Sequence, residues 1–450
     1  MKALKITAVL REINLTFLFC TITASLLTAQ HMSSQGGGEY LSEKVTCLPS
    51  QDRFQIEQML SANHQMLKQR GKLLEPATNN NVIVTLDWPL RKKSALEFNS
   101  YYATNNFVDQ KSDPGLLDYH CQSRTYDGHR GSDFDTWPFP WYIYENNLVE
   151  VVSAASGIII GKTDGNDDDH CSCYGTWNAI YIQHSDGSVA WYGHLKKNSL
   201  TTKIVGDLVS RGEYLGVVAS SGCSTQPHLH LEIYDQDNQL IDPYQGVCNY
   251  LNVTSWWSTQ RAYREPTLNA ILTHDSLPVH GCPETQENPH LSTVFMEGDP
   301  VYMALYFHDE IIGDTTTLRI RRPDGTIWNS WTHYSPNTYT KSWWWWLWYI
   351  GSNEQFGTWT FEADYRGQIH TKTFEYIDSA SLCTVTNTAE SGPGSLRNGI
   401  QCIDSSDTLY FDPTMINAEI HLDSVIIIDK NLTIYAAPDQ DILIFGTDLV

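Results

Sequence analysis

Residues 178–195 read NAIYIQHSDGSVAWYGHL, and this stretch predicts a β-hairpin. The run from Asn178 to Gln183 is typical of a strand, and Val189 to Leu195 is typical of its return strand. Between them, Asp186-Gly187 is a two-residue turn signal. A further strand is predicted from His228 to Tyr234. These pieces indicate a sheet of antiparallel strands.

Helical periodicity is weak between residues 82 and 247, so we predict that residues 86–250 form an antiparallel β domain. A helix is predicted before it, over residues 50–74. There, apolar residues follow helical spacing between a capping Ser50 and Gly71.

Two further regions follow this domain. Strand-like runs and the turn Pro323-Asp324-Gly325 predict a β-sandwich (Ig-like) over residues 285–378. Residues 383–450 hold short apolar runs, and their opening, 386–397, resembles the entry motif of β-helix domains in bacterial surface proteins. One or two coils fit, where a solenoid needs about three. The predicted fold class is mainly β: an antiparallel β-sheet domain with a short N-terminal helix, a β-sandwich, and the beginning of a parallel β-helix.

Composition narrows the class of protein. The 450 residues correspond to about three domains. They are 41% hydrophobic and 12% aromatic, which suits packed cores. The formal net charge of −23 at pH 7 repels nucleic acid and anionic membranes. Neither is therefore expected as a partner.

Residues 1–29 are predicted to be a secretory signal peptide. Lys2, Lys5 and Arg11 form a basic leader, and the apolar run from Leu15 to Leu27 is too short for a membrane span. A retained N-terminal anchor is the alternative. No stable membrane insertion is expected after signal cleavage.

Nine of the ten cysteines lie beyond the signal. In an exported protein disulfides are the default, and an odd number leaves at least one cysteine unpaired or paired outside the chain. Cys171 and Cys173 alone are weak evidence for a metal site, so we predict local disulfides for them.

Three histidine motifs lie in the β domain: His129-Arg130-Gly131-Ser132-Asp133, Tyr192-Gly193-His194-Leu195 and His228-Leu229-His230-Leu231-Glu232. A catalytic zinc site needs about three protein ligands and one open position. His228 and His230 are two apart on a strand, so their side chains share a face about 7 Å apart. One can bind a metal while the other reaches a substrate.

The order of these motifs resembles the lysostaphin-type (LytM-like) zinc endopeptidases. The shared pattern is His-x-x-x-Asp, then Tyr-x-His-Leu, then Pro-His-Leu-His-x-Glu. Three flanking segments support the resemblance: Asp87-Trp88-Pro89-Leu90, Val205 to Gly216, and Ser221-Gly222. The match covers about residues 86–245, so the β domain is predicted to be a zinc metallopeptidase domain.

The resemblance implies a role for each site residue. His129, Asp133 and His230 would bind Zn²⁺. His228 would be the general base or orient the attacking water, and His194 would hold that water or stabilise the oxyanion. Family members cut peptide bonds in the stems or cross-bridges of bacterial peptidoglycan. Glu232, on the same strand face, would either orient a ligand or form an ordinary salt bridge.

The chain departs from the family in two segments, which leaves the cleaved bond open. Residues 164–175 insert an acidic, cysteine-bearing stretch, and residues 137–142 form an unusual aromatic rim. Asp164, Asn166 and Asp168 alternate as in a calcium loop, but the required later glutamate is replaced by glycine. We predict a solvated acidic turn.

Residues without motif support receive plainer predictions. His170 and His184 are expected to be solvent-exposed, and Asp127 and Asp135 to be solvated. The tryptophan cluster of residues 343–348 is predicted to pack in a core or between domains, with a sugar-binding platform as the alternative.

The sequence therefore predicts a bacterial zinc endopeptidase that is secreted or held in the cell envelope and acts on a peptidoglycan peptide or a protein. The alternatives are a secreted protease acting on Gly-rich proteins and a non-catalytic adhesin with a wall-binding, peptidase-like domain. Residues 30–85 are a possible pro-region, in which Asn79, Asn80 and Asn81 are candidates for a further metal ligand. The oligomeric state stays open.

Overall fold

A computed structural model describes residues 34–41, 48–73, 84–282, 286–378, 383–403, 408–437 and 440–446. The predicted signal peptide and Asn79 to Asn81 lie outside these residues. The described chain is mainly β, with antiparallel sheets and few helices, as the sequence predicts. Among the described helices, none is long and apolar enough to cross a membrane.

The predicted N-terminal helix is present as α1 (Ser50–Gln69). Its buried face is formed by Ile56, Leu60 and Leu67, which pack against apolar side chains of the central sheet. The helix ends before Gly71, whose φ of 60° is a left-handed conformation that glycine adopts readily.

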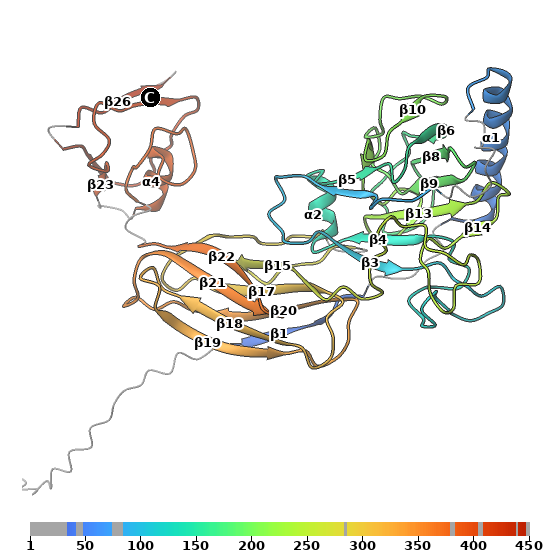
Figure 1. Cartoon of the computed structure of the whole chain (residues 1–450). Helices are drawn as coiled ribbons and strands as arrows, with labels where there is room; N and C mark the ends of the chain where they lie inside the picture. Colours follow the sequence, from blue (N-terminus) through green and yellow to red (C-terminus); the bar gives the residue numbers. More distant parts are fainter. Residues whose placement is uncertain are drawn as a thin grey trace, which may run out of the picture. The chain divides into compact units, whose positions relative to one another are not determined.

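The central sheet is antiparallel and carries the three histidine motifs. Its strand order is β10-β6-β8-β9-β13-β4-β3, and β14 pairs with β13. The strands are β3 (Tyr102–Asn106), β4 (Ser132–Thr136), β6 (Gly157–Thr163), β8 (Ala179–His184), β9 (Val189–Gly193), β10 (Leu208–Val209), β13 (His228–Tyr234) and β14 (Leu240–Ile241). Strand β13 lies between β9 and β4 (Figure 1).

The hairpin predicted from residues 178–195 is confirmed. Strands β8 and β9 pair antiparallel, and Gly187 in the turn has a φ of 88°. The Asp186 carboxylate accepts hydrogen bonds from the backbone N–H and the hydroxyl of Ser188, which fixes the turn.

Smaller elements surround this sheet. A three-stranded sheet has the order β11-β5-β2, and β12 pairs with β7. These elements and the second helix are β2 (Leu90–Lys92), α2 (Pro140–Glu145), β5 (Val149–Val152), β7 (Ser172–Cys173), β11 (Tyr214–Val217) and β12 (Cys223–Ser224).

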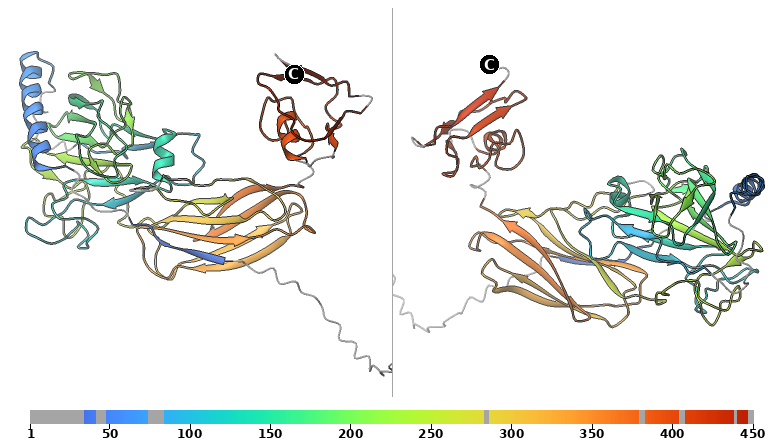
Figure 2. Two further views of the ribbon diagram at one scale, coloured as in Figure 1. Left: turned by 180° about the vertical axis from the view of Figure 1, so that it is seen from behind. Right: turned by 45° about the horizontal axis from the view of Figure 1, so that its top comes forward.

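A second β region is built from a four-stranded and a five-stranded sheet, whose facing side chains share one apolar core. The first sheet is β1 (Ser34–Glu39), β20 (Lys341–Trp348), β17 (Val301–His308) and β15 (Thr267–His274). The second is β16 (Val294–Phe295), β22 (Gln368–Tyr376), β21 (Gly357–Tyr365), β18 (Thr315–Arg321) and β19 (Ile327–Tyr334). Figure 2 shows these strands from two further sides.

This sandwich extends beyond residues 285–378. Strand β15 begins at Thr267, and β1 adds an edge strand from the N-terminal segment by pairing with β20. The N-terminal segment 34–73 therefore contributes a strand to the sandwich and a helix to the central sheet. Its predicted role as a pro-region stays a prediction.

The tryptophans of β20 alternate between two environments. Trp343 and Trp345 pack against the core of the central domain, whereas Trp346 and Trp348 are buried in the core of the sandwich and the half-buried Trp344 packs against that core. Successive side chains of a strand point to opposite faces, so one run serves both cores. The predicted packing role is confirmed.

The C-terminal residues form α4 (Leu396–Cys402) and two parallel strand pairs. The pairs are β23 (Thr408–Tyr410) with β25 (Thr433–Tyr435) and β24 (Glu419–Leu422) with β26 (Leu443–Gly446). That a β-helix begins here stays a prediction.

Four disulfides join eight of the cysteines: Cys121–Cys248, Cys171–Cys282, Cys173–Cys223 and Cys383–Cys402. The prediction of local disulfides for Cys171 and Cys173 is wrong, because their partners lie 111 and 50 residues away. Both thiols are consumed, which removes the Cys-x-Cys pair as a metal site. Cys47 lies outside the described residues.

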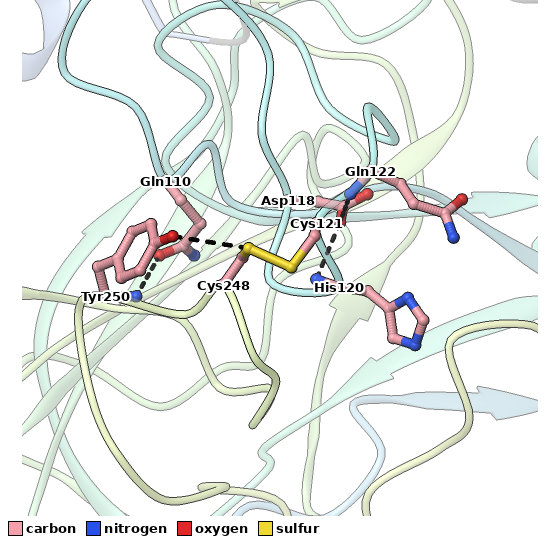
Figure 3. Close-up of a disulfide and its surroundings, with 7 residues drawn as sticks. All are labelled: Gln110, Asp118, His120, Cys121, Gln122, Cys248 and Tyr250. Atoms are coloured by element: carbon pink, nitrogen blue, oxygen red, sulfur yellow. Dashed lines mark hydrogen bonds between the residues drawn. A yellow bond between two sulfur atoms is a disulfide. The ribbon is translucent and has the colours of Figure 1, made fainter.

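The first of these disulfides holds the loop that leads to the first histidine motif (Figure 3). Beside it, the Asp118 carboxylate accepts hydrogen bonds from the backbone N–H groups of His120 and Gln122. On the other side, the Tyr250 backbone N–H donates to the Gln110 side chain. The loop before His129 is thus tied to the segment that follows β14.

Candidate metal centre

Two neighbouring strands and one loop bring three ligand-type side chains together. His230 on β13 lies opposite Asp133 on β4 in the strand register, and His129 precedes β4. The Asp133 Oδ1 atom lies 2.8 Å from His230 Nδ1 and 3.2 Å from His129 Nε2. The two imidazole nitrogens are 3.3 Å apart. All three side chains are buried, with exposed fractions of 1–2%.

The far nitrogen of each imidazole is committed to a hydrogen bond. His129 Nδ1 lies 2.8 Å from the Phe107 carbonyl, which can only accept, so this nitrogen carries the proton. His230 Nε2 lies 2.9 Å from Glu232 Oε1, a carboxylate that fixes the other ring in the same way.

The near nitrogens of the two rings face each other and Asp133 Oδ1. Three such groups repel one another at these distances unless a cation, either a proton or a metal ion, lies among them. Two imidazoles and a carboxylate are a donor set that zinc prefers, and three protein ligands leave its fourth position open. His129, Asp133 and His230 thus fit a zinc ion, the role that the resemblance to zinc endopeptidases implies for them.

Asp133 is held in its charged form. Burial alone would raise the pKa of its carboxyl, but His129, His230 and His228 outweigh burial and lower the pKa well below its usual range. The second oxygen, Oδ2, accepts a hydrogen bond of 2.9 Å from the Asn106 side chain. With Oδ2 anchored in this way, the other carboxylate oxygen, Oδ1, faces the two imidazoles.

His194 and His228, the predicted catalytic pair, lie beside this group. Their ring centroids are 4.4 Å apart, and His228 Nε2 lies 3.7 Å from Asp133 Oδ1. His194 Nδ1 donates to the Ser221 carbonyl at 2.6 Å, and His228 Nδ1 donates to the Gln226 carbonyl at 2.8 Å. Both rings are thereby fixed in one tautomer, and His228 has the larger exposed fraction, 6% against 0%.

The backbone at His194 is itself unusual. Its φ is 61°, a left-handed conformation that is sparsely populated by residues other than glycine. The conformation turns the chain at the end of β9. Such a conformation costs about 1–3 kcal/mol and persists where surrounding contacts over-determine it.

Glu232 both orients a ligand and forms a salt bridge, the two roles that the sequence leaves open. It accepts the hydrogen bond from His230 and forms a bidentate ion pair with Arg53 of α1, at 2.7 and 2.8 Å. The Tyr234 hydroxyl donates to the same carboxylate at 2.5 Å. Burial favours the neutral acid, but Arg53 and His230 outweigh it and hold the pKa of Glu232 well below its usual range.

Close packing explains the glycine at position 131. A Cβ there would lie 2.7 Å from the ring of His230, closer than real side-chain contacts. Only glycine lets the segment between His129 and Asp133 pass the imidazole at this distance.

The predicted solvent exposure of His170 and His184 is wrong. His170 belongs to the acidic insertion of residues 164–175, which is anchored beside the site. His170 is buried, and its Nδ1 is satisfied there by donating to the Gly222 carbonyl at 2.7 Å, next to the carbonyl that holds His194. His184 is also buried, with its Nδ1 donating to the Ser156 carbonyl. Within the insertion Asp164 is exposed, but Asp168 is buried and accepts a hydrogen bond from the Tyr144 hydroxyl.

The predicted exposure of the flanking aspartates is half right. Asp127 is exposed, whereas Asp135 is buried and paired with Lys341 of β20 and with Gln226. Sequence reasoning overlooked Arg53, Asn106, Gln226 and Lys341. Gln226 stands two residues before His228 and Asn106 ends β3, but no local signal links Arg53 or Lys341 to the site.

The fold and the ligand set define a mainly β protein with a buried His–Asp–His group suited to a metal. Residues 142–243 match the family described as Peptidase family M23. This segment includes His194, His228 and His230. It begins after His129 and Asp133, which are assigned to the site by their distances to His230 in the structure.

Two solved structures are similar in part. One is a zinc-containing peptidase from Vibrio cholerae, at 20% identity and a TM-score of 0.22, covering 38% of this chain and 41% of that one. The other is a putative M23 peptidase from Pseudomonas aeruginosa, at 18% identity and a TM-score of 0.24, covering 42% of this chain and 58% of that one. The chain thus spans about half the length of these structures.

Proposed function

We propose that this protein is an exported zinc endopeptidase of the lysostaphin type that hydrolyses peptide bonds in the stem peptides or cross-bridges of peptidoglycan. The observation that carries the proposal is the buried group of His129, Asp133 and His230, with the far atom of each side chain committed to another partner. The family match over residues 142–243 supports a peptidase.

The remaining histidines supply the proton chemistry. When bound, a zinc ion supplies Lewis acidity to the scissile carbonyl and to the attacking water. His228 Nε2 lies on the side of Asp133 and accepts the proton of that water, since its Nδ1 is held by the Gln226 carbonyl. His194, held through Nδ1 by Ser221, orients the water or stabilises the developing oxyanion through Nε2.

Export is supported by the covalent structure. The described residues contain four disulfides, which form and persist in oxidising compartments outside the cytoplasm. Together with the predicted signal peptide, they favour a protein that is secreted or held in the cell envelope.

Replacing His194 with alanine tests this function. We expect kcat for purified peptidoglycan to fall about 10²- to 10⁴-fold while zinc stays bound, because His194 is not in the ligand set. New amino termini report hydrolysis, elemental analysis reports zinc, and mass spectrometry of the products identifies the bond.

Other outcomes separate the alternatives. If the wild type binds zinc and cuts Gly-rich proteins but not peptidoglycan, it is a secreted protease with another substrate. If it binds intact peptidoglycan and hydrolyses neither, the adhesin alternative replaces the peptidase proposal.

A further inference from the structure

A buried ion pair joins the sandwich to the strand that carries Asp133. The Lys341 ammonium of β20 lies 2.5 Å from Oδ2 of Asp135 on β4, and the side chains are 1% and 2% exposed. The two residues are 206 positions apart in the sequence. Asp135 is two residues from Asp133 on the same strand, and it lies opposite His228 in the strand register.

The same oxygen atom of Asp135 is linked to His228 by hydrogen bonds through Gln226. The side-chain amide of Gln226 donates to Asp135 Oδ2, and the backbone carbonyl of Gln226 accepts the Nδ1 proton of His228 at 2.8 Å. One residue therefore connects the ion pair with the hydrogen bond that fixes the tautomer of His228.

The N-terminal segment closes this network. The Tyr40 hydroxyl donates to Gln226 Oε1 at 3.3 Å, and the Tyr40 backbone N–H donates to the Lys341 carbonyl. The Lys341 ammonium lies 5.0 and 6.0 Å from the ring centroids of Tyr40 and Trp137, within the range of a cation–π contact. Both parts of the Gln226 side-chain amide are thus bonded.

Charge explains why the lysine matters to the site. A buried carboxylate without a cation is costly and recruits any available donor. Without Lys341, Asp135 would compete for Gln226, for His228 and for the cation of the neighbouring ligand group. With Lys341 in place, the charge of Asp135 is neutralised, and Gln226 stays in position.

We propose that Lys341 is a positioning residue of the metal centre: acting through Asp135 and Gln226, it holds His228 in its working tautomer, so the β-sandwich is an integral part of the peptidase site. The proposal rests on the proposed function for its catalytic consequence, but the tautomer of His228 can be measured without any activity.

The test compares Lys341→Met with the double variant Asp135→Asn/Lys341→Met, which removes both charges. Lys372→Met is the control, because Lys372 of the sandwich also pairs with an acidic residue of the central domain, Glu97, at 3.6 Å. Each variant is the full chain, labelled with ¹⁵N-histidine. Long-range ¹H–¹⁵N spectra of the metal-free protein show which ring nitrogen of His228 is protonated, and kinetics on peptidoglycan give kcat and KM.

We expect Lys341→Met to change the His228 signals and to lower kcat about 10- to 100-fold with little change in KM, as changes in the outer shell of metal sites do. The double variant recovers most of kcat and the wild-type signals, and the control stays as wild type. If Lys341→Met does not fold, the double variant carries the test through its His228 signals.

Wild-type His228 signals and kcat in Lys341→Met would overturn the proposal, as would an altered tautomer in a folded double variant. A wild type without hydrolytic activity would instead count against the proposed function, while the spectra would still decide the role of Lys341.

Discussion

His230→Ala is expected to abolish both zinc binding and hydrolysis. It removes one of three ligands and leaves Asp133 and Glu232, two buried carboxylates, without the imidazole between them. Because Lewis acidity contributes several kcal/mol to the barrier reduction, we expect kcat/KM to fall by more than about 10³-fold. Zinc content by elemental analysis and release of amino termini from peptidoglycan check this.

The matched control is His184→Ala, which also deletes a buried imidazole bonded to a backbone carbonyl. It is expected to keep stoichiometric zinc, since His184 lies outside the ligand group. Stoichiometric zinc in His230→Ala would contradict the assigned ligand set.

Arg53→Met is expected to cost about 3–5 kcal/mol of folding free energy at pH 7, because it leaves the Glu232 carboxylate buried without its cation. Zinc affinity should also fall about 10- to 100-fold, since Glu232 orients His230. Denaturant unfolding of the metal-free protein and zinc titration measure the two effects separately.

The direction in which pH changes the stabilisation by the Arg53–Glu232 pair follows from the pKa of Glu232. The pKa of Glu232 is lower in the folded protein than in the unfolded chain, so its contribution is present above the unfolded value of about 4.3 and is lost as pH falls through the folded value. The stability gap between wild type and Arg53→Met should therefore narrow below about pH 4.

A surface pair provides the control for this prediction. Arg91→Met removes an arginine that is 49% exposed and paired with Glu150, and it should cost no more than about 1 kcal/mol. An equal loss of stability in both variants would show that Arg53 has no special role.

The structural features that could be predicted from the sequence are those marked by residues close together in the chain. The Asp186-Gly187 turn fixes the register of β8 and β9, and alternation along β13 places His228 and His230 on one face. That His129 and His230 lie in one site was predicted from the resemblance, which rests on the order of several motifs. The structure supplies the distances, and the catalytic roles remain predictions.

The features that escaped prediction depend on pairings between distant segments. Nothing near Cys171 indicates a bond to Cys282, because disulfide connectivity is not written in spacing. Likewise no sequence pattern marks Arg53 and Lys341, whose partners Glu232 and Asp135 come from distant segments. The carbonyl that satisfies the buried ring of His170 belongs to Gly222, 52 residues away, and no sequence pattern marks this pairing.

X-ray absorption at the zinc edge of the full-length protein with one equivalent of zinc tests the central claim most directly. We expect a first shell of nitrogen and oxygen at about 2.0–2.2 Å, with two imidazoles, one carboxylate and one exchangeable oxygen, and no sulfur. A shell containing sulfur at about 2.3 Å, or a protein that does not retain zinc, would contradict the His129–Asp133–His230 centre.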